Sequence, residues 1–188
     1  MLCNSARNSK WKNSCLGKSS KLCFNNSRRQ YFERNILIVE TNGKIFRYPP
    51  KGGVVIFNKT KDKVLMVKNN YHPYPKCQKW GFPKGHFENN EQACECAMRE
   101  LAEETNLNIS IKINDPFIKI NNSKYYLFYC NLDELGELTP RDTNEINDTK
   151  FINIEDIQNM NTNKEAKIMI TKKLSIAKTL AKPLHIKS

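Results

Sequence analysis

Residues 80–107 constrain the fold of this chain more than any other stretch. A Trp-Gly-Phe-Pro-Lys-Gly segment at 80–85 precedes residues 91–105, an uninterrupted run of helix-favouring residues that contains neither Pro nor Gly. Asn89 stands where an N-cap is expected, with Gln92 at the third helical position. The sequence therefore predicts a glycine-containing loop that leads directly into a helix.

Three carboxylates share one face of this predicted helix. Because an α-helix has about 3.6 residues per turn, Glu100, Glu103 and Glu104 stand at i, i+3 and i+4 and repel one another. A hard divalent cation such as Mg²⁺ or Mn²⁺ relieves that repulsion and accepts a substrate phosphate as a further ligand. It also polarises the phosphoryl oxygen and lowers the pKa of a bound water. The pattern therefore indicates metal-dependent hydrolysis of a diphosphate linkage.

Residues on either side of the carboxylates support this interpretation. Gly85 lets the backbone come close to the site, and its carbonyl oxygen is a candidate metal ligand. Arg99 is predicted to pair with Glu91 and to hold the loop against the helix. The alternative is a solvated acidic helix face, in which acids at i, i+4 would cost roughly a few tenths of a kcal/mol per pair. Such a face requires neither the Gly nor the Arg at a fixed position.

The spacing of these residues resembles the signature box of the Nudix hydrolases at every position but one. Asn106 stands where the family box normally has Gly, at a position that is expected to adopt a left-handed backbone conformation. Asn tolerates that conformation better than other non-glycine residues. The 80–85 segment, Cys96-Ala97 and Glu103-Glu104-Thr105 are similar to the catalytic subunit of the eukaryotic mRNA decapping complex and, more loosely, to viral decapping Nudix enzymes. The resemblance covers about residues 50–180. It implies an α/β/α sandwich with a mixed β-sheet, a bound Mg²⁺ or Mn²⁺, and capped mRNA as substrate.

A second matching segment lies downstream, where Asn144-Glu145-Ile146 precedes the aromatic-led stretch 151–155. In the decapping family the Glu of such a segment completes the metal cluster or acts as general base, so Glu145 is a candidate for both roles. The alternative is a solvated acid in a turn-rich loop. The general base stays open among Glu103, Glu100 and Glu145, and so does the choice between Mg²⁺ and Mn²⁺.

Basic charge is concentrated at the two ends of the chain, whose formal net charge is +12. Residues 1–35 contain eight Lys or Arg and one acid, and residues 164–188 contain seven Lys and one acid. Basic ends beside a pyrophosphatase site indicate a long polyanion such as RNA. The RNA-binding candidates are Lys84, Lys164, Lys167, Lys178 and Lys182; the alternative for the C-terminal lysines is a plain solvated surface.

The sequence predicts a flexible basic extension over 1–44 and a catalytic domain over 45–188. Strands are expected at 52–58, 63–69, 109–113, 117–120, 125–132 and 150–154, with a loop at 71–79. A basic amphipathic helix is expected over 162–182, opened by a Thr162/Glu165 capping box and stopped by Pro183. Its predicted apolar stripe consists of Ala166, Met169, Ile170, Leu174, Ala177 and Ala181.

The composition excludes several other classes of protein. No run of eighteen apolar residues exists, and no apolar segment follows the first charges, so neither a membrane span nor a secretory signal is expected. The seven Cys form no Cys-x-x-Cys pair, which indicates reduced thiols and disfavours a zinc site at Cys3, Cys15 and Cys23. We expect a monomeric cytoplasmic protein, with a viral host's cytoplasm included, that lacks the regulatory activator-docking domain of the decapping family. Without that domain, the weak candidates for stacking on the cap base are Trp11, Tyr31, Tyr71 and Tyr74.

Three functions are compatible with these features. The first is an mRNA decapping hydrolase that releases 7-methyl-GDP and 5′-monophosphate RNA. The second is a small-molecule Nudix hydrolase acting on nucleoside di- or triphosphates, dinucleoside polyphosphates or inositol pyrophosphates, which leaves the basic ends unexplained. The third is a non-catalytic RNA-binding relic, which leaves the intact carboxylate set unexplained.

Overall fold

The computed structural model of the chain describes residues 21–23, 28–33, 36–41, 44–70, 78–88, 90–141 and 143–186. Trp11, Tyr71 and Tyr74, three of the predicted cap-stacking aromatics, lie outside these residues, as does the predicted N-cap Asn89. The chain forms two compact units, Met1–Arg47 and Tyr48–Ser188, close to the predicted division between 44 and 45.

The first unit contains a four-stranded sheet in the order β1-β2-β3-β4. Its strands are β1 (Lys21–Cys23), β2 (Arg28–Glu33), β3 (Ile36–Thr41) and β4 (Lys44–Tyr48). The β-branched and aliphatic residues of β3 favour an extended chain, and Ile38 is fully buried. The sequence predicted a flexible basic extension over 1–44, and that flexibility stays a prediction.

The second unit is built on a mixed sheet with the strand order β11-β6-β5-β10-β12. These strands are β5 (Lys51–Asn58), β6 (Lys63–Asn69), β10 (Ser123–Cys130), β11 (Ile146–Asn153) and β12 (Lys182–Pro183). The shorter β7 (Trp80–Gly81), β8 (Lys84–His86) and β9 (Phe117–Ile120) pair with β6, β5 and β10. Strand β10 runs parallel to β5 and β12, whereas β6 is antiparallel to β5 and β11.

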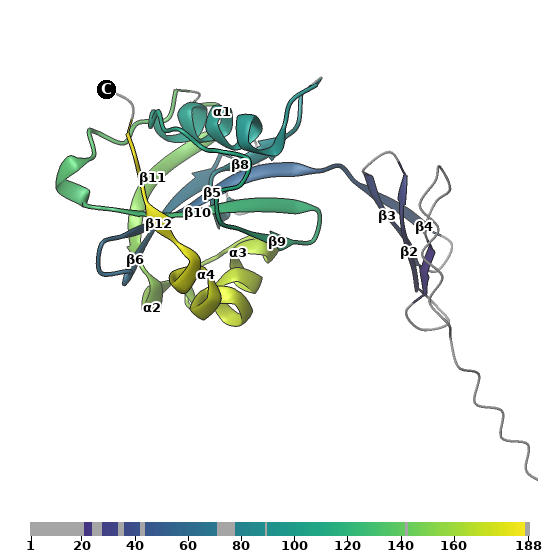
Figure 1. Ribbon diagram of the computed structural model, residues 1–188. Helices are drawn as coiled ribbons and strands as arrows, with labels where there is room; N and C mark the ends of the chain where they lie inside the picture. Colours follow the sequence, from purple (N-terminus) through teal and green to yellow (C-terminus); the bar gives the residue numbers. More distant parts are fainter. Residues whose placement is uncertain are drawn as a thin grey trace, which may run out of the picture. The chain divides into compact units, whose positions relative to one another are not determined.

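Helices cover both faces of this sheet (Figure 1). Helix α1 (Ala93–Thr105) lies on one face, and α2 (Ile154–Ile157), α3 (Lys164–Ile168) and α4 (Leu174–Leu180) lie on the other. Strand β5 is buried along nearly its whole length because its alternating side chains enter both cores. The α1 core includes Val54, Ile56, Cys94, Ala97 and Leu101. The opposite core includes Val55, Phe57, Ala166, Met169 and Ala177. The predicted α/β/α sandwich is confirmed.

The predicted continuous helix over 162–182 is wrong in its bounds and in its regularity. It begins at Lys164, because Asn163 is the N-cap and its side chain accepts a hydrogen bond from the Ala166 N–H at 2.9 Å. A π-helical turn, η3 (Met169–Lys173), separates α3 from α4. Lys182 lies in β12 rather than in the helix, since a residue before Pro is pushed towards extended backbone. The predicted stripe is nevertheless buried, apart from Leu174, which is half-buried.

The predicted strand over 109–113 is also wrong. Ile109 forms only an isolated bridge with Ile186, and Ile113 is exposed at a turn. The alternation of Ile109 and Ile111 arises because both side chains are buried in the α1 core. A single 3₁₀ turn, η2 (Leu132–Glu134), follows β10. None of the described helices is long and apolar enough to cross a membrane.

Candidate active site

Helix α1 begins after the box loop and not within it. Gln92 is the N-cap, with extended backbone, and its N–H donates to the Glu95 carboxylate at 2.7 Å. The prediction of Asn89 as the cap is therefore wrong. Glu91 consequently stands in the loop before the helix, and its carboxylate is oriented toward the helical Arg99.

Arg99 and Glu91 form the predicted pair. Arg99 Nε donates to Glu91 Oε1 at 2.9 Å and Nη2 donates to Oε2 at 3.0 Å. Nη2 also donates to the carbonyl oxygen of His86 at 2.9 Å, and the Glu88 N–H donates to Glu91 Oε2 at 3.0 Å. The hydrogen bonds from Arg99 lower the pKa of Glu91 despite its burial. These contacts join residues of the box loop to Arg99 on α1, and the holding role of the pair stays a prediction.

The remaining guanidinium nitrogen of Arg99 faces the carboxylate cluster. Nη1 donates to Glu100 Oε1 at 2.8 Å and to Glu103 Oε2 at 3.1 Å. The Glu100 side chain is only 12% exposed, whereas that of Glu103 is 50% exposed. Burial raises the pKa of Glu100 even with Arg99 beside it, and the charges of Glu103 and Glu145 act in the same direction.

Gly85 is required by the position of Glu100. A Cβ added at Gly85 would lie 1.8 Å from Glu100 Oε1, a distance much shorter than a van der Waals contact. The Gly85 carbonyl oxygen accepts a weak hydrogen bond from the Cys96 thiol at 3.4 Å. Burial raises the pKa of that thiol to about 12, so Cys96 is a neutral structural group. The proposed metal contact of the Gly85 carbonyl stays a prediction.

Glu104 is the most strongly perturbed carboxylate of the site. Burial, reinforced by the charge of Glu100, raises the pKa of Glu104 to about 8. The Lys84 N–H donates to Glu104 Oε2 at 3.1 Å and fixes the carboxylate beside β8. Two desolvated carboxylates with interacting charges are the arrangement that a divalent cation would neutralise.

Glu145 lies at the same site but comes from a segment farther along the chain than the box. It stands in the turn before β11, where its carbonyl oxygen accepts a hydrogen bond from the Asn70 N–H at 2.6 Å. A cavity of about 340 Å³ is lined by Glu103, Glu104, Arg141, Glu145 and Ile146. The structure therefore brings the candidate base Glu145 together with two box carboxylates.

The donor set fits a hydrated divalent cation. Among the described residues, no three Asp, Glu, His or Cys side chains are grouped as a complete metal cage. Mg²⁺ is commonly held by only one or two carboxylates, while waters and substrate phosphates complete its coordination. Glu100 and Glu104 supply two such carboxylates. The charge of Glu100 raises the pKa of Glu104, and a bound cation would relieve that repulsion.

A family model of the NUDIX domain matches residues 47–172. The chain belongs to the Nudix family. That range contains β5, the box loop, α1, Glu145 and α3, and it ends before α4.

Two curated relatives of this Nudix chain are yeast proteins. The m7GpppN-mRNA hydrolase of Saccharomyces cerevisiae (strain ATCC 204508 / S288c) is 28% identical over 112 residues, which cover 57% of this chain and 11% of that protein. The mRNA decapping complex subunit 2 of Schizosaccharomyces pombe is 29% identical over 121 residues, which cover 61% of this chain and 16% of that protein. The chain therefore spans less than a fifth of the length of these curated relatives.

The solved structures agree on the Nudix fold. The binary complex of the Caenorhabditis elegans Ap4A hydrolase superposes with a TM-score of 0.51 and 22% identity, covering 70% of this chain and 98% of that one. At this identity the likeness supports the fold and leaves the substrate open.

The predicted RNA-binding lysines of the Nudix chain differ in their surroundings. Lys164 and Lys167 are exposed on α3, and Lys178 is half-buried on α4. Lys182 Nζ lies 2.6 Å from Asp115 Oδ1. Lys84 Nζ lies 3.4 Å from Glu165 Oε2. The C-terminal lysines therefore do not form one uniform helical face.

Glu165 has a different role from the predicted capping box. Its carboxylate accepts hydrogen bonds from the Ser123 hydroxyl at 2.8 Å and the Tyr125 hydroxyl at 2.7 Å, in addition to the ion pair with Lys84. These contacts tie α3 to β10 and to the box loop. The sequence suggested helix capping because Glu165 follows Thr162 by three residues, and it carried no signal for the contact with β10.

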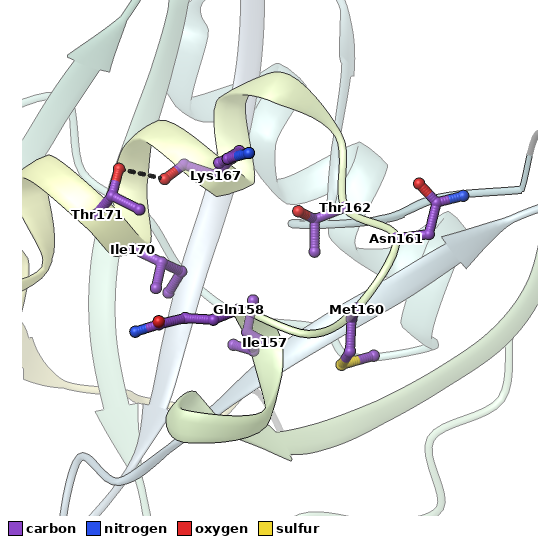
Figure 2. Close-up of a pocket in the computed structure, with 8 residues that line it drawn as sticks. All are labelled: Ile157, Gln158, Met160, Asn161, Thr162, Lys167, Ile170 and Thr171. Carbon is purple, nitrogen blue, oxygen red and sulfur yellow. Dashed lines mark hydrogen bonds between the residues drawn. The ribbon is translucent and has the colours of Figure 1, made fainter.

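A second hollow, of about 330 Å³, lies between α2 and the segment formed by α3 and η3 (Figure 2). Its lining includes apolar side chains from Ile157, Met160 and Ile170 and the predicted RNA-binding Lys167. The Thr171 hydroxyl donates to the Lys167 carbonyl oxygen at 2.8 Å. The hollow shares no lining residue with the carboxylate cavity.

Arg141 is a residue of the carboxylate cavity that the sequence analysis missed. It is the last arginine of the chain and precedes the Asn144-Glu145 segment, which is the signal that could have identified it. Its Nε donates to Asn106 Oδ1 at 2.9 Å.

Proposed function

We propose that this protein is an mRNA decapping hydrolase that cleaves the 5′ cap pyrophosphate linkage and releases 7-methyl-GDP and 5′-monophosphate RNA. The observation that carries the proposal is the meeting of Glu145 with Glu103 and Glu104 at one cavity. Glu145 belongs to the segment that resembles the decapping enzymes, and the other two belong to the general Nudix box. The similarity to two yeast decapping proteins supports the same assignment.

The carboxylates of Glu100, Glu103, Glu104 and Glu145, with the Gly85 carbonyl, would hold Mg²⁺ or Mn²⁺, which supplies charge neutralisation and an acidified water. One of Glu103, Glu100 and Glu145 accepts the proton of the attacking water. The water oxygen forms the new bond to phosphorus, and the bond from phosphorus to the bridging oxygen breaks. The leaving phosphate keeps that oxygen and its electron pair.

The basic residues supply affinity for the RNA body. Lys84 lies next to the box carboxylates, and Lys164 and Lys167 are exposed on α3. Lysines bind RNA phosphates and release counterions, which adds affinity that a free nucleotide does not receive. Lys178 and Lys182 complete the proposed set. Lys84 and Lys182 are its weaker members because Glu165 and Asp115 already pair with them. We place this activity in the cytoplasm.

The alternative is a small-molecule Nudix pyrophosphohydrolase acting on nucleoside di- or triphosphates, dinucleoside polyphosphates or inositol pyrophosphates. Its supporting observation is the fold shared with the Ap4A hydrolase structure over 98% of that chain. The volume of the carboxylate cavity, about 340 Å³, lies within the range of small-ligand sites and does not separate the two classes of substrate.

The experiment is incubation of the full chain with RNA labelled in the cap, in the presence of Mg²⁺ or Mn²⁺, followed by identification of the released nucleotide. The proposal expects 7-methyl-GDP and RNA with a 5′-monophosphate. Release of 7-methyl-GMP, or no release while free nucleotides are hydrolysed, would support a different cleavage or the small-molecule alternative.

A further inference from the structure

The C-terminal end of α1 differs from the Nudix box pattern in a way that creates a new contact. Asn106, at the box Gly position, adopts the left-handed conformation (φ 62°, ψ 11°), and its N–H donates to the Ala102 carbonyl oxygen at 3.0 Å. A Gly would make the same backbone hydrogen bond. Only a side chain can add the bond in which Asn106 Oδ1 accepts from Arg141 Nε at 2.9 Å.

A second hydrogen bond anchors Arg141 to the same helix end. The Arg141 N–H donates to the Glu103 carbonyl oxygen at 2.8 Å. The backbone and the guanidinium group of Arg141 are thus both attached within the last turn of α1. Any substrate group held by Arg141 would therefore lie at a defined distance from the carboxylates of Glu103 and Glu104.

Arg141 is the cationic member of the cavity lining, which otherwise contains Glu103, Glu104, Glu145 and Ile146. A pyrophosphate entering this cavity meets three acidic side chains, so a fixed positive charge there favours binding. A guanidinium group carries five N–H donors in a planar fork that matches phosphate oxygens, and the bond to Asn106 uses one of them. The acceptor that holds it is a neutral amide, which leaves its positive charge uncompensated by that contact.

We propose that Arg141 binds a phosphate group of the substrate and that Asn106 positions it. This inference rests on the proposed hydrolysis of a pyrophosphate linkage and assigns a binding residue to that site. The competing explanation is that Arg141 merely stabilises α1, because a cation near a helix C-terminus interacts favourably with the helix dipole. That explanation predicts a loss of thermal stability with unchanged phosphate affinity.

The test compares Arg141→Ala, Arg141→Lys and Asn106→Gly with the parent protein, using Lys119→Ala, an exposed cation on β9, as control. The substrate is whichever pyrophosphate-linked compound the parent hydrolyses, capped RNA or a dinucleoside polyphosphate. Loss of a charge-assisted hydrogen bond to phosphate should lower kcat/KM of Arg141→Ala by about 10- to 100-fold. Arg141→Lys keeps a charge near the helix end but loses the fork, so it should remain clearly impaired while keeping the parent's thermal stability.

Asn106→Gly gives the sharper measurement. Gly is well suited to the left-handed position, so this variant should keep the thermal stability of the parent. It should nevertheless lower kcat/KM several-fold, because Arg141 loses its support. In the Arg141→Ala background the same change should have no further effect, since coupled residues are non-additive.

A binding measurement makes the inference independent of turnover. Methylenediphosphonate, which cannot be hydrolysed, is titrated in the presence of Mg²⁺ by calorimetry. Its affinity should fall in Arg141→Ala and Arg141→Lys and remain unchanged in Lys119→Ala. Parent-like affinity in both Arg141 variants would overturn the inference, whatever happens to their thermal stability. A parent that hydrolyses no pyrophosphate would overturn the proposed function, and the methylenediphosphonate titration would still decide the role of Arg141.

Discussion

The carboxylate of Glu100 fills the space where any side chain at residue 85 would have to stand. A Cβ on Gly85 would lie 1.8 Å from Glu100 Oε1 and 2.1 Å from Oε2. Gly85 and Glu100 are therefore one structural unit: the loop admits Glu100 only because residue 85 has no side chain.

Gly85→Ala should displace Glu100 and lower kcat on the order of 10²-fold, because a displacement of about 1 Å at a reacting centre has effects of that size. The measurement is steady-state turnover of the parent's substrate. Gly136→Ala is the matched control, since nothing lies within 4 Å of a Cβ built there. A Gly85→Ala protein with the kcat of the parent would show that the position of the Glu100 carboxylate does not matter for the reaction.

Glu103→Gln and Glu104→Gln should each lower turnover on the order of 10² to 10³, because each removes a charge that would hold the cation at the site of developing negative charge. Folding should be little affected, since the change preserves the shape of the side chain. Glu155→Gln, an exposed acid on α2, removes the same charge elsewhere and should have parental activity. Near-parental rates for both box variants with Mg²⁺ or Mn²⁺ present would exclude the box as the active site.

Glu145→Gln tests whether this residue is more than a solvated loop acid. As general base or metal ligand it acts in the chemical step, so the change should lower kcat more than it raises KM. A general base would also alter the pH profile of kcat. Glu137→Gln, another exposed loop acid, is the control. If kcat of Glu145→Gln matches the parent from about pH 6 to 9, Glu145 has no part in catalysis.

The Asp115–Lys182 pair predicts a specific acid sensitivity. Burial alone would raise the pKa of Asp115, but hydrogen bonds from Lys182 Nζ at 2.6 Å and the Lys112 N–H at 2.8 Å outweigh it and lower the pKa. The unfolded chain then binds the proton more tightly than the folded one. The stabilisation is therefore complete above the unfolded value of 3.8 and is lost as the pH falls through the lower folded pKa.

Asp115→Asn should lower the free energy of unfolding at neutral pH by about 1–3 kcal/mol and should flatten its decline below about pH 4. Urea unfolding at several pH values measures both effects, with the exposed Asp133→Asn as control. A variant that declines in acid as steeply as the parent would refute this account of the pair. Because Lys182 is engaged with Asp115, its replacement should affect stability more than RNA affinity.

The parts of the site that depend on local spacing were predictable from the sequence. The helical positions of Glu100, Glu103 and Glu104 follow from helix geometry, and the left-handed Asn106 follows from the conformational preferences of Asn and Gly. The Arg99–Glu91 pair was also predicted, but it joins the loop to the helix and rests on the spacing of the box. The start of the helix was not predicted, because the capping box of Gln92 and Glu95 begins it three residues after the expected cap, and helix ends are the least certain part of such a prediction.

Contacts between segments that are distant in the chain could not be predicted from the sequence. Arg141 lies in the segment before β11, and the fold places this segment beside Asn106 at the end of α1. Lys182 belongs to β12 because it pairs with β10. Neither pairing leaves a periodic signal in a single sequence. The apolar stripe at 166–181 predicted burial correctly, but helical periodicity could not reveal the π-turn at 169–173, whose residues keep the same side of the segment buried.

We infer that this Nudix domain acts on the cap of a long RNA. The most direct test of that assignment is the ratio of kcat/KM for capped RNA to kcat/KM for the free cap dinucleotide over a series of salt concentrations. We predict a ratio far above one at low salt that falls as ionic strength rises. In a Lys164→Ala/Lys167→Ala variant, the logarithm of the RNA-binding constant should fall less steeply with the logarithm of the salt concentration. The slope should become shallower by about 0.7 for each lysine that binds a phosphate in the parent. Hydrolysis of the free dinucleotide should be unchanged in that variant. Equal hydrolysis of capped RNA and free cap at every salt concentration would contradict the decapping assignment and favour a small-molecule substrate.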